Sequence, residues 1–462
     1  MKLIDTNNIP SLQECLKHAD ETKELVLKKN ALEEIPALLD KFFPSNRGVC
    51  IISDENIQKA AGNRVQKILK DAGKKIAGVH TFPGEPRLHA EYEHVRFLKK
   101  WIQSLPDWQN LVPISVGAGT VNDLVKCTSS ELGIRYLSAP TASSVDGFTP
   151  NGAALLMDGY KQTINCPAPM VLAADIDVIA KAPAYLASSG FGDLASKIVT
   201  GTDWIIAEKA GAAGALEAPA IDKVCWTMTQ NGLLPALKKS VNASKGDPDA
   251  IIELFQSLAI TGFAMQYYKN SRPVSGSEHL YSHVWEMEDL CVNGVPVTHG
   301  HKVTIGTLAA TAFTELFFAD PDGPPPVPKG FRRPSKDERK AETAAAFKGS
   351  RACNDIVKTA ADKLMDEKIV NNINRIFRDT YREIRSLVFE RLVPYKEMKE
   401  LLGKADCPLI PETIGLSRKD AIATARKAQM MRIKYCILDL AWDMGNFESI
   451  LGKMESSDVY LR

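Results

Sequence analysis

Histidines gather in one short part of this sequence, with a spacing that suits metal binding. Four of the eight, His279, His283, His299 and His301, lie within 23 residues. His279 and His283 are four residues apart in GSEHLYSHVWEM, so a helix would project both imidazoles from one face. His299 follows a turn predicted in VNGVP, and a helix–turn–helix hairpin would bring three imidazoles together. For any single histidine, a structural role at a helix pair stays open as the alternative.

A divalent cation held by two imidazoles needs at least one more donor, and a carboxylate is the usual third ligand. The candidate is Asp193 in SSGFGDLASKIV, where we expect residues 188–192 to form a flexible entry and Asp193 to stand at the start of a helix. An aspartate at that position is also typical of an N-cap, and the motif alone leaves both interpretations open. A zinc-peptidase H-E-x-x-H motif is excluded because residue 280 is leucine.

A glycine-rich turn in SVGAGTVNDL has the features of a phosphate cradle. Gly117 and Gly119 would let backbone N–H groups approach phosphate oxygens at the N-terminus of the next helix. Asn122 stands where the dinucleotide fingerprint has its third glycine, so the motif is incomplete. Asp54, at the end of VCIISD, is a candidate for a ribose contact or for a simple turn.

A polar loop, APTASSVDGFTPNGA (139–153), follows the fourth predicted strand, at the sheet edge where open parallel sheets bind ligands. Its hydroxyl and carboxylate side chains suit a polyol. The sequence contains neither G-x-S-x-G nor G-x-x-x-x-G-K-[ST], which argues against serine hydrolases and P-loop NTPases.

Strands and helices alternate in the first part of the chain, which predicts parallel βαβ units over residues 1–178. Four strands are expected, in VCIISD, KIAGVHTF, LVPISVG and IRYLSAP. Residues 179–462 contain long Ala- and Leu-rich segments of helical period, and we predict an all-helical second domain. Within it, residues 320–345 are expected to form a loop insertion, because PDGPPPVPKG is rich in Pro and Gly and is followed by a basic stretch.

The composition is that of a soluble globular protein with small-molecule partners. The chain has 462 residues, 45% of them hydrophobic, and a formal net charge of +1, so no global field favours nucleic acid or an anionic membrane. The nine cysteines include no C-x-x-C pair, which indicates reduced thiols. Neither a signal peptide nor a membrane span is predicted, and we expect a cytoplasmic protein.

Five motifs in this order, GAGTVNDLVK, PTASSVDGFTPNGAAL, GFGDLASK, SRPVSGSEHLYSH and HGHKV, resemble the sn-glycerol-1-phosphate dehydrogenases. That family belongs to the superfamily of glycerol dehydrogenase, iron-containing alcohol dehydrogenases and dehydroquinate synthase. The similarity spans residues 49–444, apart from extra stretches near 206–250 and 320–360. It implies a Rossmann-like parallel-sheet domain, an all-helical C-terminal domain and an active site in the cleft between them.

The resemblance also implies roles for individual residues. The metal ligands would be Asp193, His279 and His299, with His283 or a metal-bound water as proton donor. His301 replaces the glutamate of the usual H-G-E-K-V pattern, which puts metal preference in doubt. The implied cofactor contacts are Asp54, Gly117, Gly119, Thr120, Asp123, Thr141 and Ser143. Asp146 would lie near the substrate hydroxyls, and Lys197 or Arg272 could bind its phosphate.

The implied reaction is the interconversion of dihydroxyacetone phosphate and sn-glycerol 1-phosphate with NAD or NADP and one divalent metal. Zinc is the first expectation, with nickel and iron open. The alternatives are a dehydrogenase of another polyol, a dehydroquinate-synthase-like cyclase, and a metal- and nucleotide-binding protein without turnover. We expect a small phosphorylated polyol as the partner, no nucleic acid, and a homo-oligomer.

Overall fold

The computed structural model describes residues 4–46, 48–157, 160–212, 215–216 and 220–462. The first residues of the N-terminal segment and part of the extra stretch 206–250 therefore lie outside the described residues. The chain divides into two compact units. The sheet unit comprises residues 10–194 and 235–270, and the helical unit comprises residues 1–9, 195–234 and 271–462. The division falls inside one continuous helix, and the predicted domain boundary at residues 178 and 179 stays a prediction.

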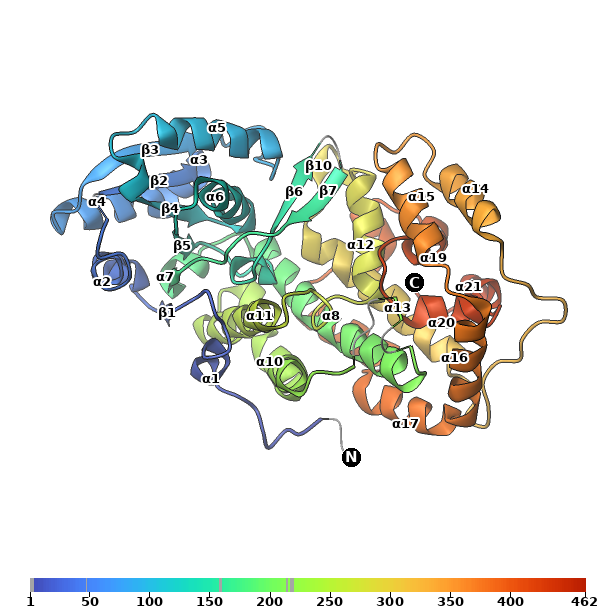
Figure 1. Cartoon of the computed structure of the whole chain (residues 1–462). Helices are drawn as coiled ribbons and strands as arrows, with labels where there is room; N and C mark the ends of the chain where they lie inside the picture. The colour runs from blue at the N-terminus through green and yellow to red at the C-terminus, as the bar shows by residue number, and fades with distance from the viewer. Residues whose placement is uncertain (1–3, 47, 158–159, 213–214, 217–219) are drawn as a thin grey trace. The chain divides into compact units, whose positions relative to one another are not determined.

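The sheet unit is built on six parallel strands in the order β1-β8-β5-β4-β2-β3. Figure 1 labels β1 to β5 of this sheet. Their bounds are β1 Glu24–Lys28, β2 Gly48–Asp54, β3 Ile76–Phe82, β4 Leu111–Gly117, β5 Leu137–Pro140 and β8 Val171–Asp175. The four predicted strands are β2 to β5, and the parallel sheet is confirmed. Strands β1 and β8 and an antiparallel hairpin of β6 (Ala153–Met157) with β7 (Tyr160–Ile164) were not predicted.

Alternate residues of the buried strands face two separate apolar layers. Val49 and Ile51 of β2 pack in one cluster, and Cys50 and Ile52 pack in the other, as the two-residue period of a strand requires. Helices α2 and α4 cover the first face, and α5 and α6 cover the second. The helices of this unit are α1 Leu12–Leu16, α2 Ile35–Phe42, α3 Glu55–Ile57, α4 Asn63–Asp71, α5 Tyr92–Gln103, α6 Gly119–Leu132, α7 Ile176–Ile179, α10 Leu233–Ser240 and α11 Pro248–Tyr268.

The strand order reverses between β2 and β4, which lie side by side. From β2 the chain proceeds to β3 on one side, and from β4 it proceeds to β5 on the other. Such a switch point is where open parallel sheets bind ligands, at the carboxyl ends of the strands. Asp54 ends β2 and Gly117 ends β4. The sheet therefore brings the two predicted cofactor segments to one place.

The helical unit contains the second part of α8 and most of the C-terminal half. Its helices are α8 Ala184–Lys209, α9 Lys223–Trp226, α12 Ser277–Met287, α13 His299–Phe317, α14 Lys336–Ala346, α15 Cys353–Asp362, α16 Glu367–Asp379, α17 Tyr381–Arg391, α18 Tyr395–Lys404, α19 Arg418–Met430, α20 Ile437–Asp443 and α21 Phe447–Ser456. Strands β9 (Cys291–Val292) and β10 (Val295–Pro296) add a small hairpin that was not predicted. Among the described helices, none combines the length and hydrophobicity needed to cross a lipid bilayer.

The insertion differs from its prediction as a loop. Residues after the Pro-rich stretch form α14, which begins at Lys336. Ser335 caps this helix by accepting from the Glu338 N–H, while the Glu338 carboxylate accepts from the Ser335 N–H. This capping box, in PSKDE, starts a helix at the point where the prolines end. The loop prediction was therefore wrong for residues 336–345, because it gave the charges more weight than the cap.

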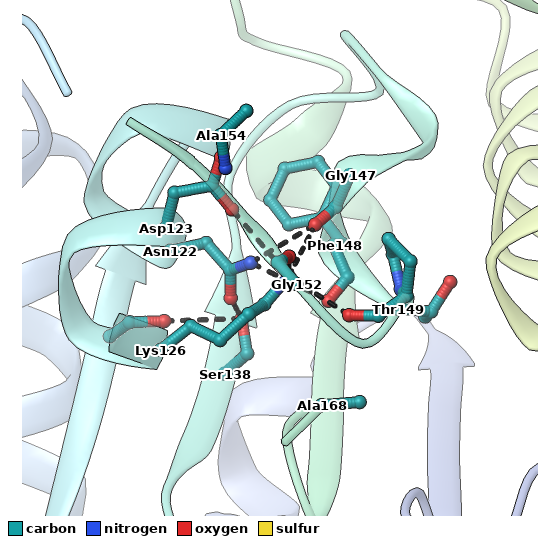
Figure 2. A network of polar contacts seen from close by, with 12 residues as sticks. Asn122, Asp123, Lys126, Ser138, Gly147, Phe148, Thr149, Gly152, Ala154 and Ala168 are labelled. Carbon is teal, nitrogen blue, oxygen red and sulfur yellow. Dashed lines mark hydrogen bonds and ion pairs between the residues drawn. The ribbon is translucent and has the colours of Figure 1, made fainter. Parts of the chain in front are cut away.

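A buried polar network holds the loop that follows β5 (Figure 2). The Lys126 side chain, fully buried in α6, donates to the carbonyl oxygens of Gly147, Pro150 and Gly152 at 2.9, 3.1 and 3.0 Å. Asn122, one turn earlier, donates to the Gly147 carbonyl at 3.3 Å. Helix α6 therefore fixes the path of this loop through side-chain hydrogen bonds to its backbone.

Asn122 also explains why the dinucleotide fingerprint lacks its third glycine. Its Oδ1 accepts from Tyr136 and Ser138, at 3.2 and 3.0 Å, so the amide joins α6 to the segment that forms β5. Gly117, by contrast, has a packing reason to be glycine. A Cβ there would lie 2.6 Å from Cβ of Val121, closer than such atoms approach.

Replacing Lys126 with Met should destabilise the protein strongly. The change removes a hydrogen-bond donor from three carbonyl groups, of which that of Gly147 still accepts from Asn122, and we expect the free energy of unfolding to fall by about 3 kcal/mol or more. Urea denaturation measures the change. Lys100→Met, at an exposed position in α5, is the matched control and should alter stability by less than about 0.5 kcal/mol. Equal small effects of both variants would contradict the structural role of Lys126.

Candidate functional site

Asp193 lies in the middle of α8, which begins at Ala184. The predicted flexible entry at residues 188–192 is therefore helical, and the N-cap interpretation of Asp193 was wrong. The side chain is fully buried, and its Oδ2 accepts from the backbone N–H of Asp146 at 2.9 Å. The loop held by Lys126 thus supports the carboxylate of Asp193. Burial of a carboxylate costs free energy unless hydrogen bonds or positive charge compensate it.

His279 and His299 come together in the helical unit through the predicted helix–turn–helix hairpin. His279 lies in the first turn of α12, and His299 is the first residue of α13. The connection turns at Asn293 and Gly294, which both have positive φ, as a two-residue hairpin turn requires. The ring centroids of His279 and His299 are 5.5 Å apart, and that of His283 is 6.3 Å from His279.

Asp193, His279 and His299 each offer one ligand atom within 4.8 Å of the others. Asp193 and His279 are buried, and His299 is partly buried. A carboxylate with two imidazoles is a donor set that divalent transition metals accept, and it leaves coordination positions for other ligands. The three residues therefore fit a catalytic metal ion of the type expected from the sequence.

A fully buried carboxylate orients His279. Glu278 Oε1 lies 2.7 Å from His279 Nδ1 and also accepts from the Gly276 N–H and the Thr200 hydroxyl, at 2.7 and 2.8 Å. Although burial alone raises the pKa of the Glu278 carboxyl, these partners lower it below its usual value. With Nδ1–H donating to an ionised carboxylate, the Nε2 lone pair of His279 is the one left for a metal.

A second carboxylate of α12 contacts two histidines. Glu286 Oε1 lies 2.6 Å from His299 Nδ1, and its Oε2 lies 3.4 Å from His283 Nδ1. The Lys302 ammonium is 3.7 Å from the same Oε1. Glu286 therefore directs Nε2 of His299 away from itself, as Glu278 does for His279, and links this imidazole to His283.

His283 and His301 are neutral imidazoles in this arrangement. Burial lowers the pKa of His283 well below its usual value, and the hydrogen bond with Glu286 opposes the shift without cancelling it. Burial also lowers the pKa of His301 to about 4. Position 301, where the resemblance leads us to expect a glutamate, therefore carries a group without charge at neutral pH.

The predicted cofactor residues lie around the switch point of the sheet. A Cβ on Gly119, the first residue of α6, would lie 3.0 Å from Cγ2 of Val145. Thr141 and Ser143 are buried, and within the described chain their hydroxyl oxygens have no hydrogen-bond partner. Two such hydroxyls, next to a glycine turn at a helix N-terminus, fit the polar groups of a dinucleotide.

Other predicted residues have structural contacts. Asp54 caps α3 by accepting from the Ile57 N–H at 2.9 Å, the turn role that the sequence left open. The Asp123 carboxylate accepts from the Ala154 N–H at 3.2 Å. Arg272 is 1% exposed and donates to the carbonyls of Tyr435 and Asp203. Four roles stay predictions: cofactor binding by Asp54 and Asp123, and phosphate binding by Arg272 or by the buried Lys197.

Sequence reasoning missed Glu278 and Glu286, although both stand beside the quoted histidines. A signal was available for each. Glu278 directly precedes His279, and Glu286 is three residues after His283, where a helix places it on the same face. Carboxylate partners of ligating histidines are common enough that an acidic residue at this spacing is a reasonable candidate.

Glu286→Gln should weaken metal binding by about 10- to 100-fold, because an amide orients and polarises the His299 imidazole less well than a carboxylate. Competition with a fluorescent chelator measures the dissociation constant. Glu288→Gln, two residues further on and exposed, is the matched control and should bind metal as the parent protein does. The orienting role of Glu286 is refuted if both variants retain the parent affinity.

Comparison with known proteins gives a consistent family assignment. A profile of the iron-containing alcohol dehydrogenases matches residues 26–183. Glycerol-1-phosphate dehydrogenase (NAD(P)+) from Bacillus licheniformis is 31% identical over 295 residues, which cover 64% of this chain and 71% of the relative. The enzyme of the same name from Halalkalibacterium halodurans is 32% identical over 293 residues, covering 63% of this chain and 70% of the relative.

Solved structures share the fold at low sequence identity. Glycerol dehydrogenase from Schizosaccharomyces pombe is 14% identical with a TM-score of 0.55, over 96% of this chain and 93% of that one. A 1,3-propanediol oxidoreductase is 13% identical with a TM-score of 0.59, over 93% and 98%. Because relatives that are at least 30% identical match over more than two thirds of their own length, the chain belongs to the glycerol-1-phosphate dehydrogenase family of alcohol dehydrogenase-type enzymes.

Proposed function

We propose that this protein interconverts dihydroxyacetone phosphate and sn-glycerol 1-phosphate, using NADH or NADPH and one divalent metal ion. The observation that carries the proposal is the group of Asp193, His279 and His299, whose ligand atoms lie within 4.8 Å of one another. The support of both imidazoles by Glu278 and Glu286 strengthens it. The relatives named glycerol-1-phosphate dehydrogenase supply the substrate class.

The three ligand residues would hold the metal, which when bound supplies a fixed positive charge that stabilises negative charge on a substrate oxygen. Zinc is our first proposal for its identity, with nickel or iron as the alternatives. Asp146 would accept hydrogen bonds from the substrate hydroxyls, on a loop whose path Lys126 fixes. His283, with Nδ1 toward Glu286, would use its Nε2 to hold or release the proton of the product hydroxyl.

The nicotinamide cofactor, which supplies the hydride, would bind at the switch point of the sheet. Its pyrophosphate would lie against the turn of Gly117, Gly119 and Thr120, at the N-terminus of α6. Thr141 and Ser143 would donate their unpaired hydroxyl groups to it. We also propose a cytoplasmic homo-oligomer, and the nine cysteines, none of which forms a disulfide bond, suit a reducing compartment.

The reaction is tested with purified, metal-loaded protein by following NADH and NADPH oxidation with dihydroxyacetone phosphate. The product is then identified with an assay that separates sn-glycerol 1-phosphate from its enantiomer. We expect stoichiometric oxidation and the 1-phosphate. Turnover without net oxidation of NADH would instead indicate a cyclase, and activity with unphosphorylated polyols alone would indicate another dehydrogenase.

Asp193→Ala should abolish metal binding and turnover together. Removing the carboxylate leaves two imidazoles, too few for a stable site, and we expect turnover to fall by at least about 10³-fold. Metal analysis of the purified variant, together with the reductase assay, measures both effects. Asp249→Ala, at an exposed position of α11, is the control and should keep both. Persistent turnover in Asp193→Ala would show that the ligand assignment is wrong.

A further inference from the structure

A phosphorylated substrate needs a cation to receive its phosphate, and the predicted Arg272 is already occupied. Its two terminal nitrogens donate to the carbonyl oxygens of Tyr435 and Asp203, at 2.8 and 3.2 Å, and the side chain is 1% exposed. A guanidinium in that state holds two backbone segments together. Another cation near the histidines is therefore of interest, and Arg432 has the required properties.

Arg432 is a partly buried cation whose side chain lacks a protein partner. It follows the end of α19, and its guanidinium makes no hydrogen bond or ion pair with any residue that the structure describes. Its φ of 51° is left-handed, a conformation that is strained for a non-glycine residue. A strained residue with an unpaired, partly desolvated charge is typical of a ligand-binding position.

The segment that carries Arg432 is joined to the loop that leads into α12. Lys434 donates to the Ser275 carbonyl at 2.8 Å, and its ammonium lies 3.2 Å from the Ser275 hydroxyl. Further along, the Asp203 carboxylate accepts from the N–H groups of both Ser277 and Ile437, at 2.6 and 2.8 Å. These bonds hold Arg432 beside the start of α12, which carries His279.

The positive charge of Arg432 affects the pKa of His283, which lies on α12 with the proposed metal ligand His279. Burial is the main cause of the lowered pKa of His283, and the positive charge of Arg432 lowers it further. Burial, with the charges of Arg272 and Arg432, also lowers the pKa of the Lys434 ammonium to about 7. Arg432 therefore adds positive charge close to His283, where an anion would be stabilised.

Nearby carboxylates are engaged elsewhere. Glu278 accepts from His279, and Glu286 contacts His299 and His283. The exposed Glu288, just after α12, pairs with Lys427 at 2.5 Å. Within the described chain, the charge of Arg432 is therefore left for a ligand from outside the chain.

We propose that Arg432 receives the phosphate group of the three-carbon substrate. The planar guanidinium can donate two parallel hydrogen bonds to phosphate oxygens, and a phosphate dianion would compensate the unpaired charge. This inference rests on the proposed function, because it assigns the phosphate to the substrate of that reaction. The same chemistry would bind free phosphate or the 2′-phosphate of NADPH, so the experiment separates these sources.

The test compares the parent protein with Arg432→Gln, both loaded with metal. We expect the KM for dihydroxyacetone phosphate to rise about 100-fold, as for loss of a partly desolvated charge pair. The KM for NADPH and the metal content should not change, and the kcat/KM for unphosphorylated dihydroxyacetone should fall far less than that for its phosphate. Arg432→Lys should restore part of the loss, and the exposed Arg351→Gln is the matched control.

Equal losses with dihydroxyacetone and its phosphate would overturn the proposal, because they would indicate a general structural effect. A change in the KM for NADPH alone would overturn it in favour of the cofactor 2′-phosphate. Calorimetry with inorganic phosphate gives a measurement independent of turnover, and equal binding by parent and Arg432→Gln would also overturn the site. A parent protein that binds inorganic phosphate through Arg432 but does not use dihydroxyacetone phosphate would refute the proposed function while leaving an anion site.

Discussion

Two carboxylates on one helix determine how the histidines of this protein can act. Glu278 and Glu286 each accept from an imidazole Nδ1, of His279 and His299, at 2.7 and 2.6 Å. An imidazole has only two ring nitrogens, so fixing Nδ1 decides which atom is offered to a metal and in which direction. Because α12 carries both carboxylates and His279, its packing sets the geometry, and α13 adds His299 through a tight hairpin.

In the sheet unit, the positions of the strands prepare the proposed cofactor site. Its switch point brings the ends of β2 and β4 together, so the glycine turn needs no specific side chain to reach a dinucleotide. What must be specific is the loop after β5, which carries Asp146, Thr141 and Ser143. Lys126 and Asn122 bind the backbone of that loop, and its Asp146 N–H supports Asp193. A buried lysine is costly, and three carbonyl acceptors offset that cost.

The sequence was sufficient for the parallel sheet, the helical half and the histidine hairpin, because these depend on local periodicity and turn residues. The sequence was insufficient where contacts between distant segments determine the role or position of a residue. Serine and glycine residues precede Asp193, so the sequence favoured a helix cap at that position. In the structure these residues are part of α8. Close packing explains the glycine at position 190, because a Cβ there would overlap the Ser143 carbonyl. Arg432 had no signal in its neighbours, since its position depends on bonds between segments far apart in the chain.

The charges buried in the helical unit give an independent reason for a cation. Asp203, Glu278 and Glu286 are all buried, and burial together with the Glu278 charge raises the pKa of Asp203 to about 6. Buried carboxylates destabilise a fold unless hydrogen bonds and positive charge compensate them. The Lys302 ammonium lies 3.7 Å from Glu286, the charges of Lys434 and Glu278 act on each other, and His283 is neutral. A divalent ion bound to His279 and His299 would polarise both imidazoles and so strengthen their hydrogen bonds to Glu278 and Glu286. The carboxylates that orient the ligands would therefore be stabilised by the metal itself.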